Sequence, residues 1–150
     1  MNEHTKLLMA FDSGEIQAEA FINWAIHKLE NGEESQSLNE LACITNPIFS
    51  EERNLFIHAV AELGGIFPPN NELKTLVAIK IAENIVKGII DANQGCTKIA
   101  EISRELESPD ILAMFELLSH EQYNHEGLGI TAENTKPSII EEAKKLINKT

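Results

Sequence analysis

The densest group of side chains that could do chemistry lies between His120 and Glu126, in the run HEQYNHE. Imidazole and carboxylate groups together are typical ligands of zinc or iron. The zinc-protease helix needs two histidines four residues apart on one face, whereas His120 and His125 are five apart. A helix would instead pair Glu116 with His120 and Glu121 with His125, which are ordinary exposed contacts. We therefore interpret the run as a polar helix end and expect no metal ion. The alternative is a metal-dependent enzyme that uses Glu116, His120, Glu121 or His125.

Other catalytic signatures are missing from the sequence. Cys43 and Cys96 have no local nucleophile motif, and the chain contains neither G-x-S-x-G nor the phosphate loop G-x-x-x-x-G-K-[ST]. The Glu-x-x-His pattern of di-iron bundles is also missing. The adjacent acid pairs at 33–34, 51–52 and 141–142 fall at loops or expected helix starts, where capping explains them. We expect a non-enzymatic protein with no catalytic residue and no cofactor.

The charge of the chain is strongly negative and unevenly distributed. Twenty-four acidic and twelve basic residues leave a net charge of −12. Residues 1–72 carry −9 of this charge and residues 73–150 carry −3. This balance argues against a nucleic-acid partner, because phosphate contacts need clusters of Lys and Arg. It would attract a basic protein and speed its association, or it would simply keep the protein soluble.

The acids of the N-terminal half are the candidate partner-binding residues. If they share a face, they would form a negative patch able to cover the basic active site of a nuclease, with carboxylates in place of phosphates. Trp24 lies on the flank of an expected helix beside Lys28, either as a half-buried lid over the core or as an apolar anchor for the partner. The candidates are Asp12, Glu15, Glu19, Trp24, Glu30, Glu33, Glu34, Glu51 and Glu52.

The candidate residues lie in or next to stretches with the apolar periodicity of a helix. No stretch shows the alternation of apolar and polar residues that is typical of a strand. Glycines at 14, 32 and 64 end three of the helices. Ser108-Pro109-Asp110 is a typical helix start, residues 124–136 are expected to be loop, and Pro137 is expected to open the last helix. The predicted helices cover about 3–11, 16–30, 38–44, 51–63, 71–93, 99–106, 111–123 and 137–147.

The stretch at about 71–93 is predicted to be one long central helix, apolar over most of its circumference. Lys80, Glu83 and Lys87 make it too polar to span a membrane. The N-terminus has no signal segment, and the two cysteines are more typical of free thiols in a reducing compartment than of a disulfide. We therefore expect a cytoplasmic protein without a membrane contact. The fold class is all-α: residues 1–150 as a single domain of seven to eight helices around the central helix, with irregular HEAT-like stacking as one possible arrangement.

The first 65 residues resemble a known class of proteins. The run Ala10-Phe11-Asp12-Ser13-Gly14-Glu15-Ile16, the segments Phe21-Ile22-x-Trp24-Ala25 and Leu38-x-x-Leu41-Ala42, the pair Glu51-Glu52 and the segment Glu62-Leu63-Gly64 are similar to small helical immunity proteins of bacteria. Those proteins are encoded beside the toxins of contact-dependent growth inhibition and other polymorphic toxin systems. The resemblance implies a cytosolic protein that binds one toxin domain tightly and blocks it. Together with the acidic charge of the N-terminal half, we expect that toxin domain to be basic, a nuclease. The alternative from the residues is a small helical scaffold or adaptor that binds a peptide or another helix in a groove.

Overall fold

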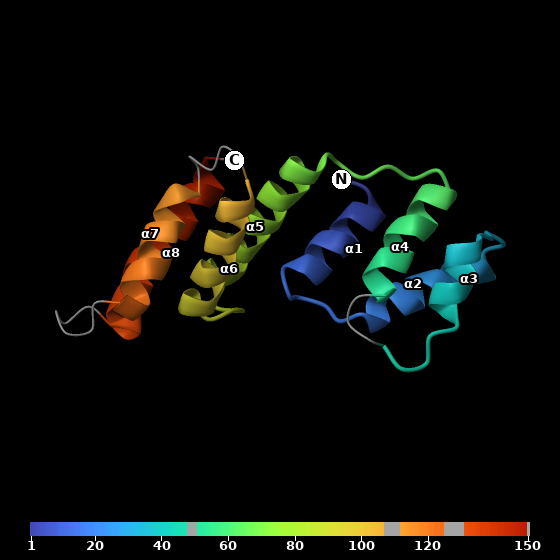
Figure 1. Cartoon of the computed structure of the whole chain (residues 1–150), viewed down its shortest axis with the longest axis horizontal. Helices are drawn as coiled ribbons and strands as arrows, with labels where there is room; N and C mark the ends of the chain where they lie inside the picture. Colours follow the sequence, from blue (N-terminus) through green and yellow to red (C-terminus); the bar gives the residue numbers. More distant parts are fainter. Residues whose placement is uncertain (48–50, 107–111, 125–130, 150) are drawn as a thin grey trace. The chain divides into compact units, whose positions relative to one another are not determined.

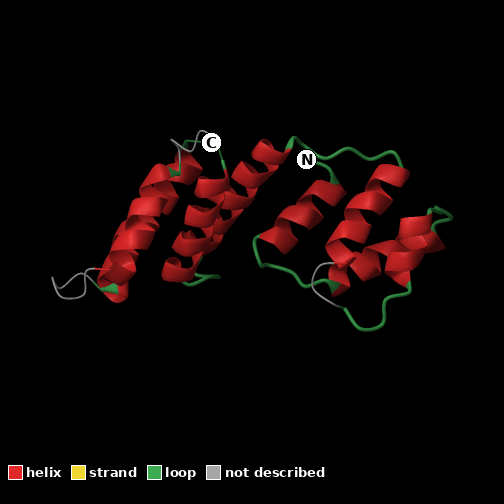
Figure 2. Ribbon diagram, viewed as in Figure 1, coloured by secondary structure: helices red, strands yellow, loops and turns green. Residues whose placement is uncertain are grey.

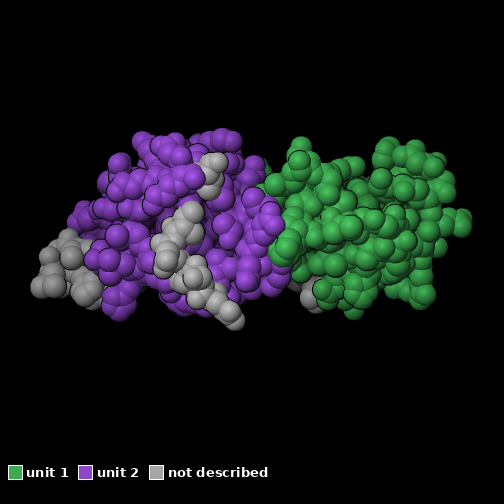
Figure 3. All heavy atoms as spheres, turned by 90° about the horizontal axis from the view of Figure 1, so that it is seen from above, with its two compact units in different colours: residues 1–69 green, residues 70–150 purple. Residues whose placement is uncertain are grey.

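The computed structural model describes residues 1–47, 51–106, 112–124 and 131–149. Over these residues the chain forms eight α-helices and no β-strand (Figures 1 and 2), which confirms the predicted all-α class. The chain divides into two compact units, residues 1–69 and 70–150, coloured separately in Figure 3. No helix in the described part of the chain has the length and apolar character that crossing a membrane requires. Each unit has its own core.

Unit 1 is built on an aromatic core. Its helices are α1 (Glu3–Asp12), α2 (Glu19–Glu30), α3 (Gln36–Ala42) and α4 (Glu51–Glu62), and α2, α3 and α4 pack against one another (Figure 1). The ring of Phe56 lies 4.4 Å from that of Phe21 and 4.7 Å from that of Trp24, measured between centroids. Phe11 lies 4.7 Å from Phe21 and joins α1 to this cluster. Such ring pairs stabilise a core beyond the apolar area that they bury.

The three predicted helix ends of unit 1 are confirmed. Gly14, Gly32 and Gly64 follow α1, α2 and α4, and all three have positive φ. In each case the next N–H donates to a carbonyl five residues back, as in a Schellman motif. The N···O distances are 2.8 Å from Glu15 to Ala10, 3.1 Å from Glu33 to Lys28 and 2.8 Å from Gly65 to Val60.

Unit 2 consists of four helices with a shared apolar interior. They are α5 (Asn70–Val86), α6 (Ala92–Glu105), α7 (Ala113–Asn124) and α8 (Ala132–Asn148). α6 packs against each of the other three, and α8 packs against α5 and α7. Gly95 allows α6 to approach α5 closely, because a methyl group on it would lie 2.6 Å from Cδ1 of Ile85. The largest fully buried side chains are Phe115, Ile81, Ile99, Leu112, Ile139, Leu146 and Gln122.

The predicted central helix is shorter than the sequence pattern indicated. α5 ends at Val86, and Gly88 follows with φ +76. The N–H of Ile89 donates to the carbonyl of Asn84 at 2.9 Å, which closes the helix. Asp91 then caps α6 by accepting from the N–H of Gln94 at 3.2 Å. The run at 71–93 therefore contains most of the 17-residue helix α5, a turn and the start of α6. Its apolar residues belong to two helices that pack against each other.

The last helix begins earlier than predicted. α8 starts at Ala132, where Thr131 caps it by accepting from the N–H of Asn134 at 3.1 Å. Pro137 lies inside this helix and does not open it. A threonine N-cap satisfies the first helical N–H groups, and it outweighed the proline as a start signal. The start predicted at 108–110 lies outside the described residues.

Candidate functional site

The candidate acids lie at two ends of α2 in unit 1. Glu19 begins that helix and shares a recess of about 110 Å³ with Phe11, the neighbour of Asp12. Glu30, Glu33 and Glu34 are found at and just beyond its other end. Since a helix rises about 1.5 Å per residue, the 12 residues of α2 separate the two groups by roughly 17 Å. The acids therefore do not form one compact patch.

Asp12 is held in an ion pair. Its two carboxylate oxygens accept from Nε and Nη2 of Arg53, both at 2.8 Å, which ties the end of α1 to the start of α4. The hydrogen bond to Asp12 raises the pKa of Arg53. A two-pronged arginine–carboxylate pair is strong and directional. Asp12 therefore contributes structure to unit 1 and little net charge to its surface.

Glu52 does not lie on the surface of unit 1. It is 1% exposed and occupies the buried face of α4 together with Phe56, Ala59 and Val60. Residues four apart share a helix face, so the position of Phe56 places Glu52 inward. The structure removes Glu52 from the partner-binding candidates, whereas its neighbour Glu51 is exposed.

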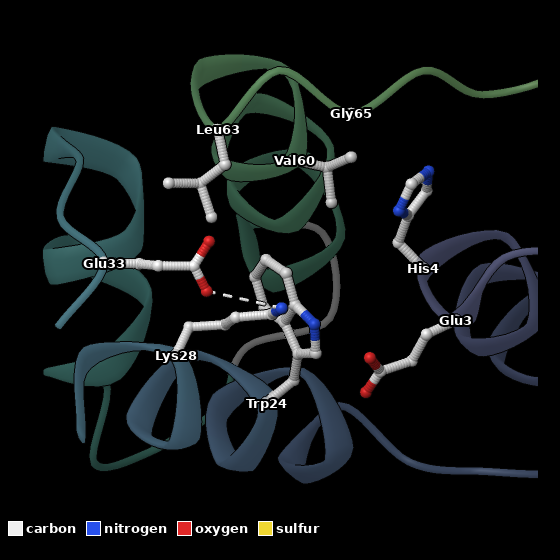
Figure 4. A pocket seen from close by; sticks show the side chains of 8 residues that line it. All are labelled: Glu3, His4, Trp24, Lys28, Glu33, Val60, Leu63 and Gly65. Atoms are coloured by element: carbon white, nitrogen blue, oxygen red, sulfur yellow. Dashed lines mark ion pairs between the residues drawn. The ribbon is translucent and has the colours of Figure 1, made fainter. Parts of the chain in front are cut away.

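Trp24 is buried and forms the floor of a recess, which we call the Trp24 recess (Figure 4). The side chain is 8% exposed, which is more buried than the half-buried lid expected from the sequence. The recess has a volume of about 120 Å³. Its lining residues are Glu3, His4, Trp24, Lys28, Glu33, Val60, Leu63 and Gly65, from α1, α2, α4 and the turns after α2 and α4.

Charged groups stand on both sides of the Trp24 ring. The Glu33 carboxylate lies 3.3 Å from Nζ of Lys28 on one side, and the Glu3 carboxylate lies on the other (Figure 4). Glu3 makes no ion pair with any residue that the structure describes. The indole nitrogen is on the side of the ring that faces Glu3 (Figure 4). Within the described residues, its N–H donates to no acceptor.

His4 and Gly65 close the recess at its rim. Nε2 of His4 donates to the carbonyl of Ile66 at 2.9 Å, and its ring meets that of Phe67 edge-on at 4.9 Å. A methyl group on Gly65 would lie 2.6 Å from Cγ1 of Val60 and 3.1 Å from Cε1 of His4. A side chain at this position would displace Val60 and crowd the ring of His4, so a glycine fits here.

Sequence reasoning identified Trp24 and Glu33 and missed Glu3, His4 and Lys28. The relation of Lys28 to Trp24 is visible in the sequence, because residues four apart share a helix face. Glu3 and His4 come from α1, and only tertiary packing brings α1 against α2 and α4. No local pattern reports that contact.

Unit 2 has an open groove between α7 and α8. Its volume is about 490 Å³, and Met114 on its edge is 44% exposed. The wall combines apolar and charged side chains. It is formed by Met114, Leu118, Pro137, Ser138, Glu141, Glu142 and Lys145.

Glu116, one of the side chains considered for a metal site, is engaged elsewhere. Glu116 accepts from Oγ of Ser103 at 2.9 Å and lies 3.8 Å from Arg104. In the described ranges, no three His, Cys, Asp or Glu side chains meet in a geometry that could hold a metal ion. His125 lies outside the described residues.

The two cysteines are both free. Cys43 is exposed and Cys96 is buried, where burial raises the pKa of its thiol to about 12. A thiol with that pKa carries almost no thiolate at neutral pH and is a poor nucleophile.

No protein-family model, curated protein or solved structure matches this chain.

Proposed function

We propose that this protein is a cytoplasmic immunity protein that binds a basic toxin domain, a nuclease, and covers its active site. The observation that carries the proposal is the charge of unit 1. Residues 1–69 contain eleven acidic and three basic side chains, a net charge of −8. Two of the three basic side chains, Lys28 and Arg53, are already paired with acids of the same unit.

The acids that remain on the surface would steer a basic partner toward unit 1. Glu15, Glu19, Glu30, Glu34 and Glu51 are exposed, and Glu33 is partly exposed. Complementary charge raises association rates, and this effect falls with ionic strength because salt screens it. Carboxylates over a nuclease active site would occupy the positions that substrate phosphates take, so binding and inhibition would be one event.

Two triple charge reversals test the proposal and locate the surface. One variant carries Glu30→Lys, Glu33→Lys and Glu34→Lys, and the other carries Glu15→Lys, Glu19→Lys and Glu51→Lys. The partner is the toxin domain encoded beside this protein, with its nuclease site inactivated. We expect the variant that covers the contact to associate at least about tenfold more slowly at low salt and to lose most of its salt dependence.

The variant at the other end of α2 serves as the matched control, because it makes the same change in net charge. Equal effects of both variants would mean that only the net charge matters. If neither variant affects association, or if no basic toxin domain co-purifies with the protein, the proposal fails.

The groove between α7 and α8 supports a second candidate function, a helical scaffold that binds a peptide or another helix. An irregular HEAT-like stacking of its helices would be the framework for such a role. Met114→Lys separates the two functions, because it places a charge in the groove of unit 2 and leaves the acids of unit 1 unchanged. Loss of a peptide or helical partner with unchanged toxin binding in this variant would favour the scaffold.

A further inference from the structure

We infer that the Trp24 recess is a receptor for one arginine side chain of the partner, together with the peptide carbonyl beside that side chain. The inference rests on the proposed function, because it supplies the partner residue that the acidic surface of unit 1 would hold. It concerns a built cavity with an aromatic floor and does not depend on the exposed acids at the far end of α2.

The recess has the size of one side-chain tip. Its volume of about 120 Å³ equals roughly four water molecules at about 30 Å³ each. A helix or an aromatic pair would not enter it, whereas a guanidinium group with part of its methylene chain would. The apolar wall formed by Val60 and Leu63 suits those methylene groups (Figure 4).

The charge of the recess favours a cation. Glu3 and Glu33 contribute two negative charges, and Lys28 contributes one positive charge that Glu33 already faces at 3.3 Å. Glu3 has no described ion-pair partner and lies across the Trp24 ring from Glu33 (Figure 4). A ligand carboxylate would approach two carboxylates in order to reach one amine that is already paired.

The geometry favours arginine over lysine. A guanidinium is planar, stacks on an aromatic face and offers five N–H donors, so it can reach carboxylates on two sides of a ring. An ammonium is a compact and strongly hydrated point charge, and burying it costs more. With Glu3 and Glu33 on opposite sides of the indole, the flat group with several donors fits better.

The indole N–H of Trp24 is open to the recess. Trp24 is 8% exposed, lines the recess and donates to no acceptor in the described residues. The indole nitrogen is not one of the fully buried and unpaired side-chain atoms of the described residues, so a ligand acceptor can reach its N–H from the recess. An arginine side chain has no acceptor, so an oxygen of the ligand that meets this N–H would be a peptide carbonyl of the same residue.

The experiment titrates the full-length protein with N-acetyl-L-arginine amide, which carries both the guanidinium and the carbonyls. The chain has one tryptophan, so a single indole N–H resonance reports on the recess. We expect that resonance to shift saturably, with a Kd on the order of 1 mM for a ligand of this size. N-acetyl-L-citrulline amide, which has the same shape without the charge, should not shift it, and the lysine analogue should bind more weakly.

Variants assign the effect to the recess. Glu3→Gln should weaken binding of the arginine amide about fivefold. Glu19→Gln, an exposed acid at the other end of α2, should leave it unchanged. Thermal melting of both variants shows that they remain folded. Equal shifts by the arginine and citrulline compounds, no saturable shift, or equal effects of the two variants would overturn the inference.

This outcome is separable from failure of the proposed function. If the charge reversals slow toxin association while the arginine amide does not shift the indole resonance, the protein binds its basic partner without using this recess. If arginine binds in the recess and no basic toxin domain binds the protein, the recess has another peptide ligand and the proposed function fails alone.

Discussion

At the scale of residues, neighbours in the sequence have opposite environments in unit 1. Glu51 is exposed, while Glu52 is 1% exposed because it shares a helix face with Phe56. Asp12, expected to contact a partner, is bound by Arg53 through two hydrogen bonds of 2.8 Å. An acid pattern in the sequence shows how much charge there is, but not which carboxylates stay available.

Replacing Arg53 tests whether the pair with Asp12 stabilises unit 1. Arg53→Met keeps the long aliphatic stem and leaves Asp12 without its partner. We expect the free energy of unfolding to fall by about 1 kcal/mol, because the pair is half-buried and has two-pronged geometry. Urea denaturation measures the loss, and Lys6→Met, at an exposed lysine, is the control. Equal losses in the two variants would contradict a specific role of the pair.

Glu62 gives unit 1 a pH dependence with a defined sign. The Glu62 carboxylate accepts a hydrogen bond from Oγ of Ser37 and another from the backbone N–H of Ser37, the latter at 3.0 Å. The hydrogen bond from the Ser37 side chain is the main reason that the pKa of Glu62 is lowered from its ordinary value of 4.5. A lowered folded-state pKa contributes stability that is fully present above the ordinary value and is lost as pH falls through the folded pKa.

We therefore expect the urea midpoint of the natural protein to fall between about pH 5 and pH 3 more steeply than that of Glu62→Gln. Glu40→Gln, at an exposed acid of α3, is the control for general acid effects. If Glu62→Gln and the natural protein show parallel curves, the bond to Ser37 does not carry this dependence.

At the scale of elements, the ends of helices decide how the apolar pattern is divided. The run at 71–93 keeps a helical period, yet α5 stops at Val86 because Gly88 adopts φ +76 and the N–H of Ile89 bonds back to Asn84. Glycines 14, 32 and 64 predict the ends of three other helices correctly. At Gly88 the apolar residues on both sides continue the helical pattern, so the sequence does not indicate the end of the helix.

Gly88→Ala should destabilise unit 2 through the backbone alone. A methyl group at this position meets nothing within 4 Å, so no steric contact adds to the effect. A left-handed conformation costs a non-glycine residue about 1 kcal/mol, and we expect a loss of that size. Lys87→Ala, one residue earlier and exposed, is the control in thermal or urea unfolding. No loss at Gly88 would mean that α5 continues past Val86 in solution.

A buried polar network fixes α6, α7 and the start of α8. Nδ2 of Asn93 donates to Oε1 of Gln122 at 2.7 Å and to the carbonyl of Ala132 at 2.9 Å. Nε2 of Gln122 in turn donates to Oγ1 of Thr97 at 3.0 Å. Gln122 is 0% exposed and Asn93 is 6% exposed, so neither amide has water as a substitute partner.

Gln122→Leu should lower the free energy of unfolding by about 2 to 3 kcal/mol, because it removes one of the two acceptors of the buried Asn93 amide and the donor to Thr97. Glu121→Gln, on the adjacent position of α7, is the matched control and should change stability little. Comparable stability of Gln122→Leu and the natural protein would show that the apolar replacement compensates for the lost bonds.

At the scale of the whole molecule, the chain contains two compact units, and each buries its own core. Their charges differ: residues 1–69 carry −8 and residues 70–150 carry −4 of the total of −12. The exposed acids of the proposed toxin contact and the Trp24 recess all belong to unit 1. The single domain expected from the length of the chain stays a prediction.

We expect residues 70–150, expressed alone, to fold cooperatively, since a unit with its own hydrophobic core can be stable without the rest of the chain. Circular dichroism on heating and dispersed NMR signals measure this. The full chain, observed through the signals of the same residues, is the reference. A fragment that stays unfolded would show that the two units form one cooperative domain.

The sequence by itself determined the class of the fold, most helix boundaries and the location of the negative charge, because periodicity, glycine turns and composition are local properties. Only the tertiary structure decided which acids remain available, where the run at 71–93 divides, and that Glu3 and His4 face Trp24. Those features depend on contacts between residues far apart in the chain, and no local pattern records which helix faces meet. Trp24 illustrates this limit of the sequence. The helical period places it beside the apolar face of a helix, whereas the packing of α1, α2 and α4 makes it the floor of a recess.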